Sequence, residues 1–194
     1  MGRKPTPDAR DNLLDAAERL FNAHGVHAVG LQQIINECGC GKNMLYREFR
    51  SKDDLIVGYL QRSHQDWMCM VDAVIAPLAG NPGAQIIAVV KAAAAKATVP
   101  DARGCPLRNT HAEFPEADHP AHQVAVEHFD AVRAQLLGLA RQTGTADPEA
   151  LTDRLLLIID GLYASGGSFG GPATAVAFAE EVVQMATRPA AIAG

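Results

Sequence analysis

The chain has 194 residues, of which 48% are apolar and 20% charged, and its formal net charge is -5. This composition can bury roughly 70% of the unfolded surface in one or two packed units, which excludes a disordered protein. No apolar run approaches the roughly 20 residues of a membrane-spanning helix, and charged residues from Arg3 to Asp11 exclude a signal peptide, so we expect a cytoplasmic protein without a membrane partner.

Helical periodicity describes the first 50 residues. A first helix has Thr6 as its N-cap, Pro7 at its first position and Gly25 at its end. A second, very short helix carries Leu31, Ile34, Ile35 and Cys38 at helical spacing. Two glycines interrupt the chain, and a third short helix follows from about residue 42 to 48, with Leu45 and Phe49 pointing inward.

Helices also account for the remainder. Ser51 and Asp54 have the spacing of a capping box and begin a long helix, residues 52–78, whose apolar stripe is long enough to link two packed units. Further helices are expected at 84–98, 119–143, 147–165 and 173–187, while 99–118 is irregular or forms a short helix. Residues 155–159 alone resemble a strand, but their neighbours have a helical period. The sequence therefore predicts an all-α protein of about nine helices.

The segment CGCGKNMLYREFRSKDDL, residues 38–55, carries the main evidence on function in the sequence. Two short helices joined by a glycine-containing turn and braced by a preceding helix are typical of a helix-turn-helix. A zinc knuckle needs four ligands, whereas Cys38 and Cys40 are one residue apart with no second Cys/His pair nearby, so we expect thiols. Residues 42–52 carry four basic side chains against Glu48 alone, which favours an anionic partner.

These residues carry a family resemblance. FNAHGV, LQQIINECGCGKNMLYREF and SKDDL resemble the tetracycline-repressor (TetR) family of bacterial transcriptional regulators over about a third of the chain. The resemblance implies a homodimeric, ligand-responsive regulator, most often a repressor, without cofactor or enzymatic activity. A helix-turn-helix DNA-binding domain would occupy residues 1–50 and an effector-binding and dimerisation domain residues 51–194. Gly30, Asn43, Met44 and Glu48 depart from the family pattern and leave the operator sequence open.

The third helix is expected to enter the major groove of operator DNA. Asn43 would then pair with adenine, Met44 would touch a thymine methyl, and Lys42 would reach guanine or phosphate. Phosphate contacts are expected from Tyr46, Arg47 and Lys52, further contacts from Gln32 and Gln33, and minor-groove contacts from Arg3 and Lys4. Ordinary packing of Tyr46 and simple solvation of the basic side chains are the alternatives.

The rest of the chain is expected to bind a small effector and a second subunit. Aromatic, apolar and a few polar side chains are typical of effector pockets, with plain core packing as the alternative. The candidates are Trp67, Met68, Met70, Leu107, Asn109, His111, Phe114, His128 and Phe129. One short recognition helix reads only a few base pairs, so two copies are needed. The last two helices are apolar on more than one face, and the candidate dimer contacts are Leu155, Ile158, Ile159, Leu162, Phe178, Val182 and Met185.

Two other patterns are weaker. Residues 166–170 spell the G-x-S-x-G of a hydrolase elbow, but no histidine follows them, so we expect no enzyme. A cluster of donors suits zinc or nickel, although we expect no metal; it comprises Cys105, His111, Glu113, Glu116, Asp118, His119, His122 and His128. The alternative function is a small-molecule or metal-binding helical protein without sequence-specific DNA binding. Operator, regulated genes, effector and direction of regulation stay open.

Overall fold

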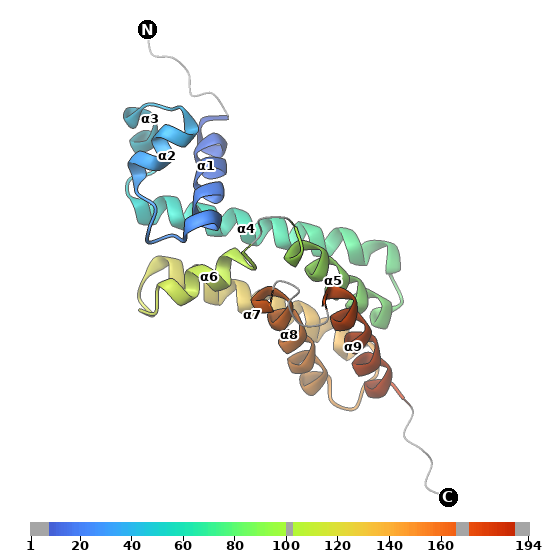
Figure 1. Ribbon diagram of the computed structural model, residues 1–194. Coiled ribbons are helices and arrows are strands. Elements are labelled where there is room, and N and C mark those ends of the chain that lie inside the picture. Colours follow the sequence, from blue (N-terminus) through green and yellow to red (C-terminus); the bar gives the residue numbers. More distant parts are fainter. Residues whose placement is uncertain (1–7, 100–102, 166–170, 189–194) are drawn as a thin grey trace, which may run out of the picture. The chain divides into compact units, whose positions relative to one another are not determined.

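The computed structural model describes residues 8–99, 103–165 and 171–188, and every regular element in these ranges is a helix (Figure 1). The α-helices are α1 (Asp8–His24), α2 (Leu31–Cys38), α3 (Lys42–Glu48), α4 (Lys52–Ile75), α5 (Pro82–Ala97), α6 (Pro106–Glu113), α7 (Pro120–Gln142), α8 (Pro148–Ser165) and α9 (Gly171–Ala186). A short 3-10 helix, η1 (Ala76–Leu78), follows α4. The all-α prediction is confirmed.

Most expected boundaries agree with these helices to within two residues. The expected helix at 52–78 corresponds to α4 together with η1, and the run 155–159 lies inside α8 rather than in a strand. The short helix allowed within 99–118 is α6. The expectations for Arg3, Lys4, Thr6, Pro7 and the 166–170 motif lie outside the described residues.

The described chain forms two compact units that do not follow chain order. Unit 1 comprises the residues up to Gln65 together with Pro106–Glu127, and unit 2 comprises Asp66–Cys105 together with the residues from His128 onward. Unit 1 therefore contains α1 to α3, the first part of α4, α6 and the start of α7. The predicted functional division at residue 50 stays a prediction.

In unit 1, α1 braces α2, α3 and α4. Arg10 of α1 donates to the Glu48 carbonyl at 3.1 Å, and its guanidinium lies 4.3 Å from the centre of the Phe49 ring. Arg62 of α4 pairs with two acids of α1, Asp15 at 2.6 Å and Glu18 at 2.7 Å. The apolar faces meet in a core in which Leu13, Leu45, Phe49, Leu55 and Ile56 are fully buried. The helix-turn-helix is thus held as one packed body.

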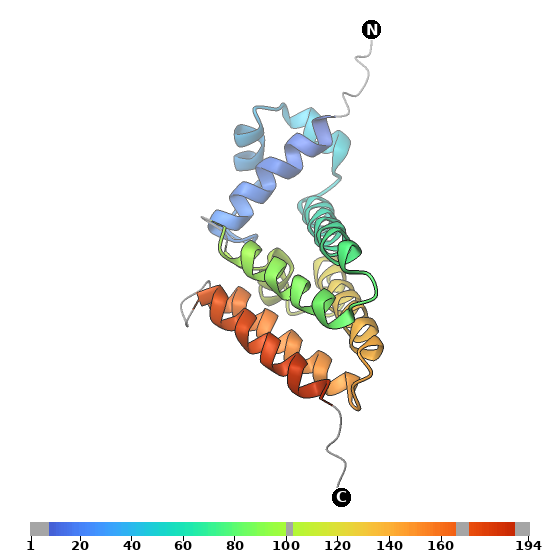
Figure 2. The same cartoon turned by 90° about the vertical axis from the view of Figure 1, so that its right-hand side faces the viewer.

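In unit 2, α5 packs against α8 and α9, which also pack against each other (Figure 2). Small buried side chains on α5, Ala93, Ala94 and Ala97, leave room for this close approach. Ion pairs of Arg133 with Asp153 and of Arg141 with Glu149 join α7 to α8. Within the described ranges, no helix combines the length and apolar character required to cross a membrane.

Candidate nucleic-acid interface

The turn between α2 and α3 has the geometry that its glycines predict. Gly39 adopts φ 67° and ψ 19°, a left-handed conformation that side chains other than glycine adopt at a cost. Its N–H donates to Asn36, and the next amide, of Cys40, donates to Ile35 at 3.2 Å. Gly41 is extended, with φ -84° and ψ 150°, and is the N-cap of α3. The chain therefore makes a tight turn over three residues and begins a new helix.

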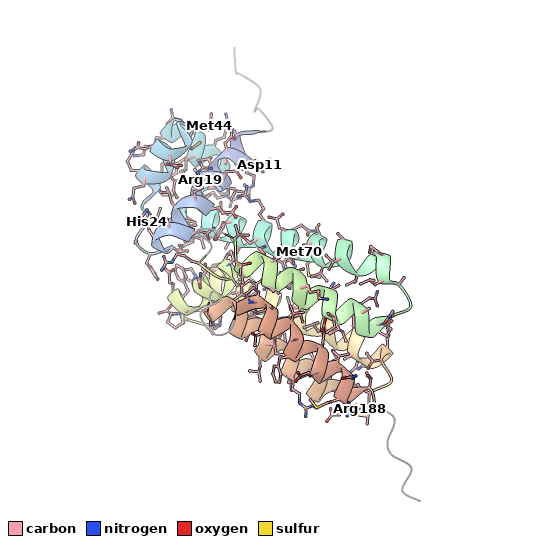
Figure 3. The ribbon with its side chains drawn as sticks, turned by 45° about the vertical axis from the view of Figure 1, so that its right-hand side comes forward. Asp11, Arg19, His24, Met44, Met70 and Arg188 are labelled. Carbon is pink, nitrogen blue, oxygen red and sulfur yellow. The ribbon has the colours of Figure 1, made fainter. Side chains whose placement is uncertain are left out.

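The remaining surface of α3 is available to a partner. Leu45 and the residue after the helix, Phe49, are fully buried, which turns the opposite side of α3 outward. Lys42, Asn43, Tyr46 and Arg47 are exposed, and Met44 is half-buried. The Lys42 ammonium lies 5.8 Å from the centre of the Tyr46 ring, one helical turn on. Figure 3 shows Met44 at the outer edge of the three-helix group α1 to α3.

Glu48 is the one acid on α3, and it forms an ion pair with Arg47, a predicted phosphate contact. The Arg47 guanidinium pairs with the Glu48 carboxylate at 2.9 Å, and the Glu48 side chain is only 19% exposed. A carboxylate beside a DNA phosphate would repel it, and the pairing with Arg47 partly neutralises the charge of Glu48 within the helix. The same pair reduces the charge that Arg47 can offer to phosphate.

Gln32 and Gln33 are exposed on the first turn of α2, but their side chains already have partners. Gln33 Oε1 accepts a hydrogen bond from the Gly30 N–H at 2.7 Å, and Gln32 Nε2 donates to Asn36 Oδ1 at 2.9 Å. Gly30, the N-cap of α2, has no side chain that could accept a hydrogen bond from the helix. The Gln33 side chain instead accepts from the backbone N–H of Gly30. DNA contacts by these two residues stay predictions.

Lys52 is half-buried rather than projecting into solvent. Its ammonium donates to the His27 carbonyl at 3.3 Å. Burial lowers the pKa of Lys52, while the charges of Asp53 and Glu113 act in the opposite direction. The side chain therefore fastens the start of α4 to the loop between α1 and α2, and a phosphate contact would have to compete with this bond.

The two cysteines of the turn are free, half-buried thiols. Burial, with a hydrogen bond and charge interaction from Cys38, raises the pKa of the Cys40 thiol to about 11. Cys40 is therefore protonated at neutral pH and is a poor metal ligand or nucleophile. In the part of the chain that the structure describes, no group of three or more His, Cys, Asp or Glu side chains is placed to hold a metal ion.

Unit 1 also contains a contact that the sequence did not reveal, which we call the Glu113 clamp. The two carboxylate oxygens of Glu113, the last residue of α6, accept hydrogen bonds from the backbone N–H groups of Val26 at 3.0 Å and His27 at 2.7 Å. His27 Nε2 lies 2.7 Å from the Glu113 carbonyl oxygen. At Gly25, with φ 85°, a Cβ would come within 3.1 Å of the carboxylate. The end of α6 is thereby fixed to the loop that precedes α2.

Four of the candidate effector residues lie in unit 1: Leu107, Asn109, His111 and Phe114. The buried Phe114 ring contacts two imidazoles, with centroids 4.4 Å from His27 and 4.2 Å from His119. His111 lies 4.5 Å from His122, and burial, followed by the charges of His122 and Arg108, lowers the pKa of His111. Here Phe114 packs among unit 1 side chains.

The other candidate effector residues lie in unit 2: Trp67, Met68, Met70, His128 and Phe129. The structure brings Trp67 and His128 together, with ring centroids 6.2 Å apart, and places Phe129 next to His128 at 5.9 Å. Both methionines are half-buried. A role in effector binding stays a prediction for all nine residues.

An apolar groove of about 820 Å³ runs along α8 and α9. Among the candidate dimer residues, Phe178 and Met185 are exposed in this groove by 53% and 56%, whereas Leu155 and Ile159 are buried in the core of unit 2. Ile158, Leu162 and Val182 line the floor of the groove and are themselves buried. Leu157 was not among the predicted residues, although it is 71% exposed at the same groove.

Comparisons with known proteins agree on one family. The family profile described as "Bacterial regulatory proteins, tetR family" matches residues 13–58. A solved TetR-family transcriptional regulator from Streptomyces coelicolor is 30% identical, with a TM-score of 0.88, and the match covers 93% of this chain and 97% of that one.

Curated relatives match in the first part of the chain. An HTH-type transcriptional regulator of Mycobacterium tuberculosis is 37% identical over 62 residues, which are 32% of this chain and 31% of that protein. The HTH-type transcriptional activator FasR of Mycolicibacterium smegmatis is 40% identical over 60 residues, which are 31% of this chain and 27% of that protein. The chain thus spans about a third of the length of the curated relatives it matches.

Proposed function

Because the chain belongs to the TetR family of bacterial transcriptional regulators, we propose that it binds a near-palindromic operator as a homodimer and is released from it by a small-molecule effector. The single observation that carries this proposal is the exposed face of α3, where Lys42, Asn43 and Tyr46 surround a helix anchored by Leu45. Cationic and amide side chains on a helix of this kind suit the phosphates and base edges of a major groove.

Dimerisation is supported by the groove of α8 and α9. Three large apolar side chains, Leu157, Phe178 and Met185, are more than half exposed there. Exposed apolar clusters on a folded chain are typical of interaction surfaces. A second copy on this groove would bury them, and the dimer would carry the two α3 helices that an operator with two half-sites requires.

The response to an effector is proposed to pass through α4. Leu55, Ile56 and Leu60 of this helix belong to the core of unit 1, and Trp67 and Val71 of the same helix belong to the core of unit 2. A displacement of α4 in unit 2 therefore acts on the packing of the helix-turn-helix. We place DNA binding in residues 1–50 and effector binding and dimerisation in residues 51–194. A changed distance between the two α3 helices would then lower operator affinity.

Repression, rather than activation, is proposed from the usual behaviour of the family. The relative FasR is named as an activator. A reporter gene placed behind the operator, read with and without the regulator, distinguishes the two directions.

The test uses promoter fragments that the purified protein retains from genomic DNA. Lys42→Ala and Tyr46→Ala are expected to weaken binding to all retained fragments, and Lys42→Ala should reduce the slope of log affinity against log salt by about 1. Asn43→Ala is expected to relax preference at one base pair by about 1–3 kcal/mol. Lys91→Ala, which removes an exposed charge from α5, is the control.

Retention of no fragment by the wild-type protein would reject the proposal. Indifference of retained fragments to all three α3 variants would reject the assigned surface. The alternative, a small-molecule-binding helical protein without operator binding, is favoured by the acid on α3, Glu48, and by the neutral charge balance of residues 1–60. Ligand binding without any DNA retention would establish it.

A further inference from the structure

The only tryptophan of the chain, Trp67, has a buried hydrogen-bond donor without a partner. Its side chain is 4% exposed in α4, and its Nε1 meets no acceptor within the described residues. The indole N–H can only donate, and leaving it unmet in a core costs free energy. Because nearly all buried polar atoms in folded proteins are paired, this donor requires an explanation.

Aromatic side chains from two further helices surround this donor. The rings of His128 on α7 and Tyr163 on α8 each lie 6.2 Å from Trp67 between centroids, at interplanar angles of 78° and 64°. Phe129 is edge-on to His128 at 5.9 Å. We call these four residues of unit 2 the Trp67 cluster. Edge-to-face rings form surfaces onto which a further aromatic ring can pack.

The backbone before α6 lies against the backbone of one cluster residue, Tyr163. A Cβ on Gly104, which has φ 81°, would come within 2.5 Å of the Tyr163 carbonyl oxygen, so only glycine fits there. The neighbouring Cys105 is buried. The main chain at residue 104 therefore packs against α8 at Tyr163, beside rings of which Trp67, His128 and Tyr163 are buried and Phe129 is half-buried.

We propose that the Trp67 cluster binds the effector, and that the effector is an uncharged aromatic compound whose carbonyl oxygen accepts a hydrogen bond from Trp67 Nε1. The proposal rests on the proposed function, since it identifies the ligand class of the same regulator. The four residues include no Lys or Arg that would balance an anion, and burying an unbalanced charge is unfavourable. The aromatic part packs on the rings, and the oxygen satisfies the donor.

The position of Trp67 connects this site to regulation. Trp67 belongs to α4, and residues of α4 one to three turns earlier are buried in the core of unit 1. An acceptor that binds Nε1 therefore acts on the helix that also supports the helix-turn-helix. The same bond that selects the ligand displaces the element through which the response is proposed to pass.

The test uses a matched pair of probes on the full-length protein. 1-Acetonaphthone has an aromatic carbonyl, whereas 1-ethylnaphthalene has nearly the same shape without the oxygen. With 15N labelling, a single tryptophan gives a single indole N–H signal, which moves downfield when it donates to a carbonyl. We expect the ketone to move this signal and to bind at least tenfold more tightly than the hydrocarbon. Equal affinities, no binding of either probe, or an unmoved indole signal would overturn the proposal.

Two variants isolate the donor. Trp67→Phe keeps an aromatic ring and is expected to abolish the tenfold preference for the ketone. If that variant does not fold, a tryptophan auxotroph supplied with benzothienylalanine replaces only the indole N–H by sulfur, and the same loss of preference is expected. A preference for the ketone that persists without the N–H contradicts the proposal.

Operator retention, measured in parallel, keeps the two proposals separable. If promoter fragments are retained but neither probe binds, the ligand-class inference fails and the proposed DNA-binding function stands. If the ketone preference depends on Trp67 but no DNA is retained, the binding site stands and the operator function fails.

Discussion

Replacing Glu113 by glutamine removes the charge from the Glu113 clamp but keeps the size of the side chain. In the clamp, Oε1 accepts from the N–H of Val26 at 3.0 Å and Oε2 from the N–H of His27 at 2.7 Å. A glutamine amide has one oxygen, so it can serve only one of these donors. Its NH2 group would face the other N–H, which is also a donor.

The magnitude follows from the two bonds. A hydrogen bond to a charged group contributes about 1.5–3 kcal/mol. The His27 contact is exposed and water can replace it, whereas the Val26 contact is partly buried. We therefore count one bond and expect Glu113→Gln to destabilise the loop between α1 and α2 by about 1.5–3 kcal/mol. Since 1.4 kcal/mol is a factor of ten, exchange of the two amides should become roughly 10- to 100-fold faster.

Amide hydrogen exchange of the intact protein, resolved at Val26 and His27, measures this effect. The control is Glu116→Gln, which neutralises an exposed acid three residues further on. Unchanged exchange in Glu113→Gln, or an equal change in the control, refutes the reasoning. Operator affinity should fall in parallel because the loop positions α2 and thereby α3.

Four further outcomes are expected. Gly39→Ala should lower the free energy of unfolding, measured in urea, by about 1–2 kcal/mol, because Gly39 has a left-handed backbone with open space around it. Gly41 is extended and equally open, so Gly41→Ala should leave the free energy of unfolding nearly unchanged. Similar losses in both variants would contradict this. Leu157→Glu should give a monomer in sedimentation, while Val126→Glu at another exposed apolar residue should not; a persistent Leu157→Glu dimer would remove the groove from the interface. Glu48→Gln should tighten operator binding by roughly 1.5- to 5-fold, the scale of an exposed charge pair, and an unchanged titration would show that Glu48 is remote from phosphate. Because its pKa is raised to about 11, Cys40 should be about 0.1% thiolate at pH 8. The rate of its alkylation, followed by mass spectrometry, should therefore rise about tenfold per pH unit up to pH 10. Fast alkylation at pH 8 would contradict the raised pKa.

Local signals account for what could be predicted. The third helix was expected at about 42–48 and lies at Lys42–Glu48 because Gly39 and Gly41 delimit it from one side and Phe49 ends its apolar face. The start of α4 was likewise marked by Ser51, whose Oγ accepts from the Asp54 N–H at 3.0 Å. The Asp54 carboxylate, however, accepts from the Arg50 N–H rather than from Ser51. Helix positions therefore follow from patterns a few residues long.

Contacts between distant segments could not be predicted in the same way. Glu113 lies 86 and 87 positions from the two amides it binds, and no short pattern marks such a pairing. The hydrogen bond from Lys52 to His27 could not be predicted either, because it depends on how the loop before α2 folds back. In the run from Leu155 to Ile159 every residue is apolar, so the sequence could not show that Leu157 is the most exposed of them.

The central claim is that two copies of α3 read one operator from the same side. Dimethyl sulfate footprinting of a retained promoter fragment tests it most directly, because the reagent reports guanine N7 in the major groove. We predict two protected half-sites separated by one helical turn, about 10–10.5 base pairs, or a multiple of it, with both protections weakened in Lys42→Ala and Asn43→Ala. A single protected site, or two sites that are indifferent to both substitutions, would contradict the account.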